Sequence, residues 1–550
     1  MPPSPFPKKT TDTIALLLIT LVTGTAAFLA YSADDLPRID DWTYAWSVEH
    51  FHRTGALRLL DWSAHYPLAQ IFWAMGFTSL FGFSFAVLRV STLVAGWLGL
   101  LAFYLTLRTL HLAPLPSALG TFALLFNPVF FVFGHSFMTD IPFVSTINIA
   151  LLGYVLWAQQ RRAVWLCLGG VFATLAFLIR QLGAVLPLLP LLYLLLGSRG
   201  GDRRALSWRH VLCLLFPFLG ISLTLWWIRD IHGPTSVSLW RAEPFTYFFS
   251  PSLWLSSHFW WIYFQGFGHA LASLGLLLGP VAFASLHGRS RRFLLVSLAL
   301  VAWIMGSYLW HFGALPPVVH EGELRVEELG SARRWITGGE GLHRPLPPAM
   351  EWMLLGLSLG SGIALLVTLL EDLWQRIPQV HQSSAIVLLH CLLQFVLIEV
   401  LWLYHDRYYL PLLPGLIIVL LRLIKWTKVT QTVMVTGVLV YAAISVSGTI
   451  DNYRFHRTVA QARTWLLEQQ VPPWHIDAGY ALNGWWLYAH PANLPPGASP
   501  EPDERYIKTY GELPYIIANV PIPSYRVVRV FAWQTLWAIS NKIYVLQRAD

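Results

Sequence analysis

The sequence predicts a polytopic α-helical membrane protein with a small α/β domain outside the membrane at its C-terminal end. Of its 550 residues, 55% are hydrophobic and only 12% are charged, whereas soluble domains carry about 25% charged residues. Apolar runs near the length needed to cross a bilayer recur along most of the chain. Residues 451–550 differ, because they are polar, rich in Pro and Gly, and contain strand-like runs at 525–533 and 542–547.

The apolar runs are the predicted transmembrane helices. A helix needs about 20 residues to cross a bilayer, and about thirteen runs approach that length. They lie at 13–31, 86–107, 115–134, 141–158, 163–180, 182–198, 211–228, 266–286, 293–311, 350–370, 384–404, 409–424 and 431–449. A further run at 68–81 is short, and its length fits either a crossing or a helix that lies on the surface.

The charges of the loops decide how the short run is placed. If 68–81 does not cross, the basic loops all fall on one side, as cytoplasmic loops do. The basic positions are Arg108, Arg161, Arg162, 199–210, 287–292, Arg376, Lys425 and Lys428. The sequence therefore predicts a cytoplasmic N-terminus and an extracytoplasmic C-terminus. The net charge of +8 then comes from these loops. It suits contact with anionic lipid headgroups and does not indicate binding of nucleic acid.

The ends of the chain and its cysteines complete the predicted organisation. Lys8 and Lys9 precede the first apolar run without a small-residue cleavage site, so this run is predicted to remain as an anchor. All three cysteines lie in apolar runs and predict neither a disulfide nor a metal framework. We therefore expect a transmembrane module at 1–450 and an extracytoplasmic domain at 451–550.

The first outer loop, predicted at 32–67, carries a dense group of acids. Asp34, Asp35, Asp40 and Asp41 follow the first apolar run, and charged groups at a membrane edge are candidates for function because they are costly there. From Asp41 onward, polar and aromatic residues recur at helical spacing. This spacing predicts a helix that lies in the membrane interface. The alternative is a solvated loop that is negatively charged.

With this topology, polar residues at the outer ends of several predicted helices lie on one side of the membrane. They are Asp40, Asp41, His65, Tyr66, Arg89, Asp140, Arg180, Gln181, His405, Asp406 and Arg407. Carboxylates beside fixed cations suit a reaction between a hydroxyl and a phosphate-linked lipid. A carboxylate accepts the proton of the acceptor as general base, and arginine binds a phosphate through two parallel hydrogen bonds.

Each of these residues also has a structural interpretation. Asp140 fits the start of a helix with Pro in its first turn. Arg180 fits a turn between two helices, and Arg89 and Arg407 fit anchors at the membrane surface. The histidines lack the spacing of a metal site. Glu399 lies within an apolar run, where a lone acid is either functional or the partner of a base.

Short motifs in a fixed order carry a resemblance to a known family. They are Asp40-Asp41-Trp42-Thr43-Tyr44, His65-Tyr66-Pro67, Leu80-Phe81-Gly82 followed by Arg89, Thr139-Asp140-Ile141-Pro142, Arg180 between two apolar runs, and Arg407-Tyr408-Tyr409-Leu410-Pro411. Together they resemble the GT-C class of membrane glycosyltransferases, in particular bacterial relatives of protein O-mannosyltransferases and the aminoarabinose–lipid A transferases. The stretch 462–488 is similar to the opening of the outer domain in bacterial members. The resemblance covers the whole chain.

The resemblance implies a GT-C fold and a role for each matched residue. Asp40 is the leading candidate for the general base and Asp41 the second, since the family usually has Asp-Glu where this chain has Asp-Asp. Asp140 would assist in positioning the acceptor or the donor. The implied phosphate-binding residues are Arg180, Arg407, His405 and His65, and the implied substrate-lining residues are Tyr44, Tyr66, Arg89 and Tyr408. No cofactor is implied, and the sequence leaves a requirement for a divalent metal open.

The resulting prediction is an inverting hexosyl- or pentosyltransferase in the bacterial inner membrane. It would move a sugar from a polyprenyl-phosphate donor to a hydroxyl of a lipid, glycan or protein acceptor at the periplasmic face. Its other partners would be membrane lipids. Two alternatives from other classes remain, a transporter or flippase of a lipid-linked sugar and a scaffold that has lost catalysis. A transporter needs ionisable groups through the bilayer, and Glu399 is the clear intramembrane acid of this sequence.

Overall fold

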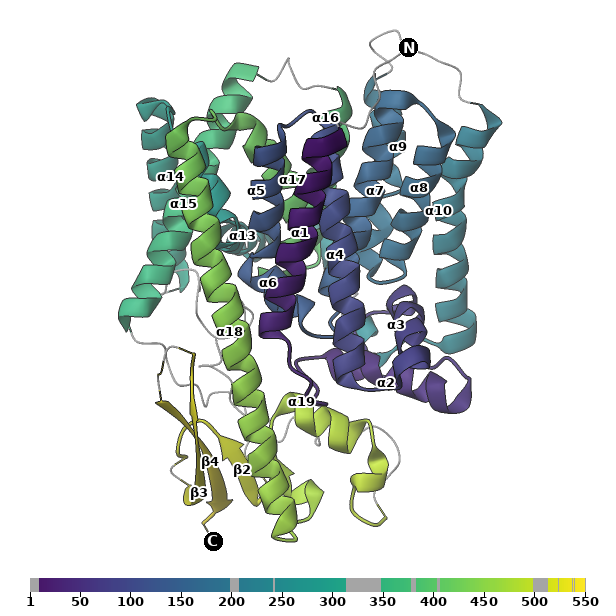
Figure 1. Cartoon of the computed structure of the whole chain (residues 1–550), viewed down its shortest axis with the longest axis vertical. Coiled ribbons are helices and arrows are strands. Elements are labelled where there is room, and N and C mark those ends of the chain that lie inside the picture. The colour runs from purple at the N-terminus through teal and green to yellow at the C-terminus, as the bar shows by residue number, and fades with distance from the viewer. Residues whose placement is uncertain are drawn as a thin grey trace.

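The structure is a computed structural model of the chain. It describes residues 9–197, 207–240, 243–312, 348–376, 382–402, 406–497, 513–522, 524–536, 538 and 540–549. Helices make up most of it, and one small sheet lies near the C-terminal end (Figure 1). The predicted phosphate-binding residue His405 and most of the predicted basic loop 199–210 lie outside the described residues.

Within the described residues, six helices are long and apolar enough to cross a membrane. They correspond to α1 (Lys9–Ala30), α4 (Phe85–Thr109), α7 (Asp140–Gln160), α10 (Trp208–Trp227), α13 (Ser257–Ser285) and α18 (Lys428–Glu468), and the one that begins with α10 continues to His232. The count becomes seven if the bent pair α5 (Pro114–Leu125) and α6 (Pro128–Gly134) is one span. The helices run side by side as a bundle (Figure 1). The protein is therefore a multi-pass membrane protein.

The other predicted runs also coincide with helices. The helices at these runs are α8 (Ala163–Phe177), η1 (Gln181–Val185) with α9 (Leu188–Gly197), α14 (Arg291–Phe312), α15 (Pro348–Arg376), α16 (Gln382–Val400) and α17 (Leu413–Leu423). Length and composition thus support six or seven spans. The full count of about thirteen stays a prediction.

The predicted run 115–134 is not one straight helix. Its two halves, α5 and α6, meet at an angle of 64°. The break lies at Asn127, whose side chain accepts hydrogen bonds from the backbone N–H groups of Val129 and Phe130 at 3.2 Å, while Pro128 occupies the first position of α6. This pair starts a new helix because the Asn side chain accepts hydrogen bonds from N–H groups of the first turn, which have no partner within the helix, while Pro has no N–H group.

α2 (Asp41–Thr54) and α3 (Leu68–Phe81) lie at the end of the bundle where the sheet is found (Figure 1). α2 begins at Asp41, as the helical spacing of its aromatic residues predicts. α3 has 14 residues, which give a length of about 21 Å, less than the roughly 30 Å of a hydrocarbon core. This length agrees with the prediction that the run 68–81 does not cross.

The described residues of the C-terminal part form a four-stranded sheet in the order β1-β2-β4-β3. β1 (Ile476–Asp477) pairs parallel to β2 (Tyr515–Ala518), while β4 (Ser540–Arg548) pairs antiparallel to β2 and to β3 (Tyr525–Gln534). The predicted strands at 525–533 and 542–547 coincide with β3 and β4.

α18 joins the bundle to this sheet as one continuous helix. It extends beyond the bundle (Figure 1), and the predicted boundary at residue 450 falls inside it. Its buried residues Phe455, Val459 and Leu466 pack in one apolar cluster with Ile517 and Val545 of the sheet. The bundle and the C-terminal residues therefore share a helix, and their division into two domains stays a prediction.

Candidate active site

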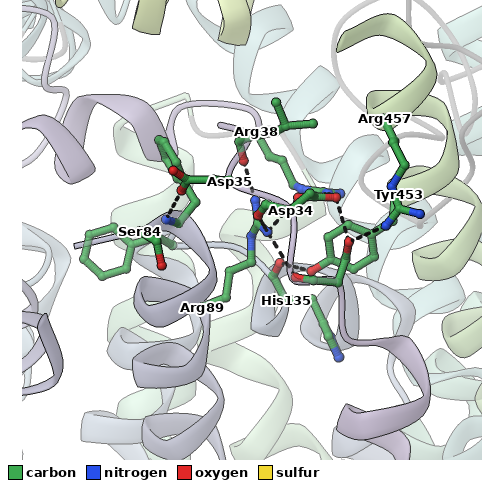
Figure 2. Close-up of polar contacts among 12 residues, drawn as sticks. Asp34, Asp35, Arg38, Ser84, Arg89, His135, Tyr453 and Arg457 are labelled. Carbon is green, nitrogen blue, oxygen red and sulfur yellow. Dashed lines mark hydrogen bonds and ion pairs between the residues drawn. The ribbon is translucent and has the colours of Figure 1, made fainter. Parts of the chain in front are cut away.

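The first loop is held to the bundle by a buried cluster of charges. The Asp34 carboxylate lies 3.0 Å from the Arg38 guanidinium and 2.9 Å from that of Arg89, and Ser32 donates a hydrogen bond to it at 2.6 Å. Figure 2 shows the side chains of Asp34, Arg38 and Arg89 close together. Burial alone would raise the pKa of Asp34, but the charges of Arg38 and Arg89 bring it well below its usual range.

Further contacts tie the same cluster to α4 and α18. Arg38 lies 3.5 Å from the centroid of the Tyr453 ring and donates to Asn452 at 3.1 Å (Figure 2). Asp35 accepts a hydrogen bond from the backbone N–H of Phe85 at 2.6 Å, at the start of α4. We call Asp34, Asp35, Arg38 and Arg89 the loop anchor. The predicted substrate-lining residue Arg89 pairs with Asp34 of this anchor, donates to the backbone carbonyls of Ser32 and Leu36, and lies 5.5 Å from the centroid of the Tyr453 ring.

Asp41 is buried and bonded to the backbone. Its two carboxylate oxygens accept hydrogen bonds from the N–H groups of Arg38 at 2.6 Å and Phe137 at 3.3 Å, and the residue is 0% exposed. Burial raises the pKa of Asp41 to about 6, against the opposing charge of Arg89. Asp41 therefore joins the start of α2 to the segment between α6 and α7.

Asp40 lies in a different environment from Asp41. One of its oxygens accepts a hydrogen bond from the Tyr480 hydroxyl at 2.6 Å, and the other lies 3.5 Å from the Arg407 guanidinium. The Asp40 side chain keeps 28% of its surface exposed. Of these two adjacent acids, Asp40 is therefore the one that is accessible from outside the protein.

Asp140 and Arg180 form a second ion pair close to these groups. Their side chains lie 2.9 Å apart and are each 1% exposed, and the Arg180 Nε donates to the Thr139 hydroxyl at 2.7 Å. Asp140 is the first residue of α7, and Arg180 lies in extended backbone just before η1. The predicted helix start at Asp140 and the predicted turn at Arg180 thus bring the two side chains together.

Two tyrosines connect Asp40 to this pair. The guanidinium groups of Arg180 and Arg407 each lie 5.4 Å from the centroid of the Tyr408 ring, within the distance of a cation–π contact. Tyr44 of α2 is buried, and burial followed by the charge of Asp40 raises its pKa, while Arg180 and Arg407 oppose that rise. We define the Asp40 cluster by the residues Asp40, Tyr44, Asp140, Arg180, Arg407, Tyr408 and Tyr480.

The cluster is assembled from distant parts of the chain. Asp40 and Tyr44 come from the first loop and α2, Asp140 and Arg180 from both ends of the α7–α8 hairpin, and Tyr480 from α19 (Tyr480–Asn483). Arg407 and Tyr408 belong to η7 (Asp406–Leu412), all of whose residues are buried. Two carboxylates and two guanidiniums meet here, so a hydroxyl group and an anionic group are both suited to this site.

The predicted residues His65 and Tyr66 have different described neighbours. The Tyr66 hydroxyl lies 2.8 Å from that of Ser238 and accepts a hydrogen bond from the Thr235 N–H at 3.1 Å. His65 is buried beside it. These contacts join the start of α3 to the segment that follows α10. Binding of the substrate by His65 and Tyr66 remains a prediction.

Sequence reasoning missed Tyr480 and its partner Trp62, although it noted the stretch 462–488 that contains Tyr480. It also grouped Asp34 and Asp35 with Asp40, whereas their contacts lie in the loop anchor. In the described part of the chain, no three His, Cys, Asp or Glu side chains are grouped so that they could hold a metal ion.

Comparison with known proteins supports the predicted resemblance. Residues 65–227 match the model of a family described as dolichyl-phosphate-mannose-protein mannosyltransferase. This segment includes Asp140 and Arg180, and it begins after Asp40 and ends before Arg407. The predicted resemblance to GT-C membrane glycosyltransferases is thereby confirmed. No curated protein matches the chain in a sequence search.

Two solved structures are similar over much of the chain. ArnT from Cupriavidus metallidurans bound to undecaprenyl phosphate is 15% identical, with 98% of this chain and 99% of that chain covered and a TM-score of 0.42. AglB from Archaeoglobus fulgidus, an archaeal oligosaccharyltransferase in complex with an inhibitory peptide and a dolichol-phosphate, is 14% identical. That match covers 90% of this chain and 62% of AglB, with a TM-score of 0.43.

Proposed function

We propose that this protein is a membrane glycosyltransferase that moves a sugar from a polyprenyl-phosphate donor to an acceptor hydroxyl. The observation that carries the proposal is the Asp40 cluster, in which an accessible carboxylate lies 3.5 Å from a buried guanidinium. The family match over residues 65–227 supports the same reaction class, because its description names a dolichyl-phosphate sugar as donor.

Asp40 is proposed as the general base. Its exposed carboxylate takes the proton of the acceptor hydroxyl as the acceptor oxygen forms a bond to the anomeric carbon. The bond from that carbon to the phosphate oxygen breaks at the same time, and the phosphate leaves with the electron pair. A single displacement of this kind inverts the anomeric centre.

Arg407 and Arg180 are proposed to hold the phosphate. A phosphate gains negative charge as the sugar departs, and fixed guanidiniums stabilise that charge in a site with little water. Arg180 is kept in place by Asp140 and Thr139. Arg407 faces Asp40 at 3.5 Å, which is longer than a strong charge-assisted hydrogen bond of about 2.7–2.9 Å. A donor phosphate can therefore compete with Asp40 for Arg407.

We place the site on the periplasmic side of a bacterial inner membrane and propose no cofactor. The placement rests on the loop charges, which put the basic loops on the side opposite to the first loop. The first loop, α2, α3 and the sheet all lie at one end of the bundle (Figure 1).

The test is a thin-layer assay with purified protein in lipid and a panel of radiolabelled polyprenyl-phosphate sugars. We expect one donor to be consumed by the wild-type protein and by the control variant Asp230→Asn, whose carboxylate pairs with the exposed Arg229. We expect Asp40→Asn and Arg407→Ala to be inactive. Transport of a donor across the bilayer without its consumption would show a flippase and not an enzyme. Binding of a donor without transport or consumption would favour a scaffold.

A further inference from the structure

The C-terminal residues reach the first loop through a short aromatic segment. α19 and the turn η9 (Gly484–Tyr488) pack against α2, where the Trp42 ring makes edge contacts with Tyr480 at 5.9 Å and Tyr488 at 5.8 Å between centroids. Gly484 lies so close to the Trp42 ring that a Cβ there would overlap it. We call residues 480–488 the aromatic segment. Its close fit fixes the position of Tyr480 relative to α2.

A chain of two hydrogen bonds runs from the first loop through Tyr480 to Asp40. The indole N–H of Trp62 donates to the Tyr480 oxygen at 2.7 Å, and that hydroxyl lies 2.6 Å from the Asp40 Oδ1. An indole N–H only donates and an ionised carboxylate only accepts. The hydroxyl proton of Tyr480 must therefore point to Asp40.

The two oxygens of Asp40 thus have separate partners. Tyr480 holds Oδ1, and the Arg407 guanidinium faces Oδ2. Asp40 precedes the first residue of α2 and makes no side-chain cap to that helix. Its direction is consequently set by groups from η7 and from the C-terminal part of the chain, and not by its own helix.

We propose that Tyr480 is a positioning residue for Asp40, so that the C-terminal aromatic segment completes the site. The inference rests on the proposed function of Asp40 as general base. A general base must lie within about 2.6–3.2 Å of the oxygen that carries the proton it takes. The bond from Tyr480 fixes the carboxylate while leaving its exposed edge to the acceptor. When a donor phosphate engages Arg407, Tyr480 is the contact that keeps Asp40 in place.

The test compares Tyr480→Phe with a matched variant of the same segment. Tyr480→Phe keeps the ring on Trp42 and removes the hydroxyl, and Tyr488→Phe removes a hydroxyl from a ring that also contacts Trp42. A hydrogen bond to a charged group contributes about 1.5–3 kcal/mol, which corresponds to roughly a 10- to 100-fold effect on rate. We expect kcat of Tyr480→Phe to fall by that factor with little change in KM for the donor, while Tyr488→Phe stays within about twofold of wild type.

A double-variant cycle separates this role from general loosening of the segment. Trp62→Phe removes the donor that orients the Tyr480 hydroxyl, so it is expected to lower kcat by a smaller factor. In the Tyr480→Phe background the same change should have almost no further effect on kcat, because the chain is already broken. Multiplicative effects, or an equal loss of kcat in Tyr488→Phe, would overturn the positioning role.

Asp40→Asn distinguishes failure of the inference from failure of the proposed function. If Asp40→Asn is inactive while Tyr480→Phe keeps the wild-type kcat, Tyr480 has no positioning role and Asp40 remains the base. If Asp40→Asn keeps full activity, the proposed function of Asp40 is wrong and the role of Tyr480 falls with it. Binding of undecaprenyl phosphate, measured for each variant, is expected to stay unchanged in Tyr480→Phe, and its loss there would also contradict the inference.

Discussion

Asp34→Asn is expected to destabilise the protein strongly, because two buried guanidiniums depend on this one carboxylate. Arg89 is 0% exposed and Arg38 is 4% exposed, and each lies within about 3 Å of Asp34. Removal of one partner from a buried ion pair costs about 3–5 kcal/mol, since the remaining charge stays buried without compensation. We therefore expect Asp34→Asn to lower the free energy of unfolding by about 3–5 kcal/mol.

The pH of the measurement follows from the lowered pKa of Asp34. A carboxyl group whose pKa is lowered on folding stabilises the folded state at a pH above its usual pKa, which is 3.8 for Asp34. This stabilisation is lost as the pH falls through the pKa of the folded state. At about pH 7 the whole effect is present. Denaturant unfolding in detergent at that pH measures it directly.

Asp35→Asn is the matched control for the same loop. Asp35 accepts one hydrogen bond from the backbone N–H of Phe85 at the start of α4, and loss of such a contact costs about 1 kcal/mol. If Asp34→Asn were no more destabilising than Asp35→Asn, the loop anchor would not hold the first loop as described.

Two further perturbations test the contact between the first loop and the C-terminal residues. Gly484→Ala places a Cβ against the Trp42 ring, so stability should fall by about 1–3 kcal/mol in unfolding experiments. Gly76→Ala, inside α3, meets no atom within 4 Å and should not lower stability, because Ala favours a helix over Gly. His490 lies 3.0 Å from Glu49, and although burial lowers the pKa of His490, the hydrogen bond to Glu49 raises it overall. The contact therefore stabilises the folded protein at a pH below 6.5, the usual pKa of histidine, and weakens as the pH rises through the raised pKa of His490. The unfolding midpoint of wild type should fall between about pH 5.5 and pH 8, and His490→Gln should remove the part of that fall that His490 causes.

The bundle could be predicted from the sequence because membrane crossing is a local property. A run of about 20 apolar residues forms helix in lipid whatever its neighbours are, so each predicted run falls on helical residues, although some runs comprise two helical segments. The bend at Asn127 was missed, since the run 115–134 is apolar throughout both halves. The dipeptide Asn127–Pro128 was the available signal, and it marks a helix start in the structure.

The resemblance points to Asp40 as the general base, but the partners of the four acids of the first loop could not be predicted from their residue types. Asp34, Asp35, Asp40 and Asp41 are chemically alike and lie within one short segment. Their roles depend on partners from α4, η7 and α19, which are far away in sequence. The bond between Asp40 and Tyr480 joins residues 440 positions apart, and no local pattern predicts such a contact.

The most direct test of the account is transfer by wild-type protein and Asp40→Asn, measured with saturating donor in the same lipid preparation. We predict that Asp40→Asn loses at least about 100-fold in kcat, as removal of a general base does, while it still binds undecaprenyl phosphate and unfolds at the wild-type midpoint. Wild-type turnover by Asp40→Asn would contradict the account, because no other carboxylate of the first loop is both exposed and paired with an arginine of the Asp40 cluster among the described residues.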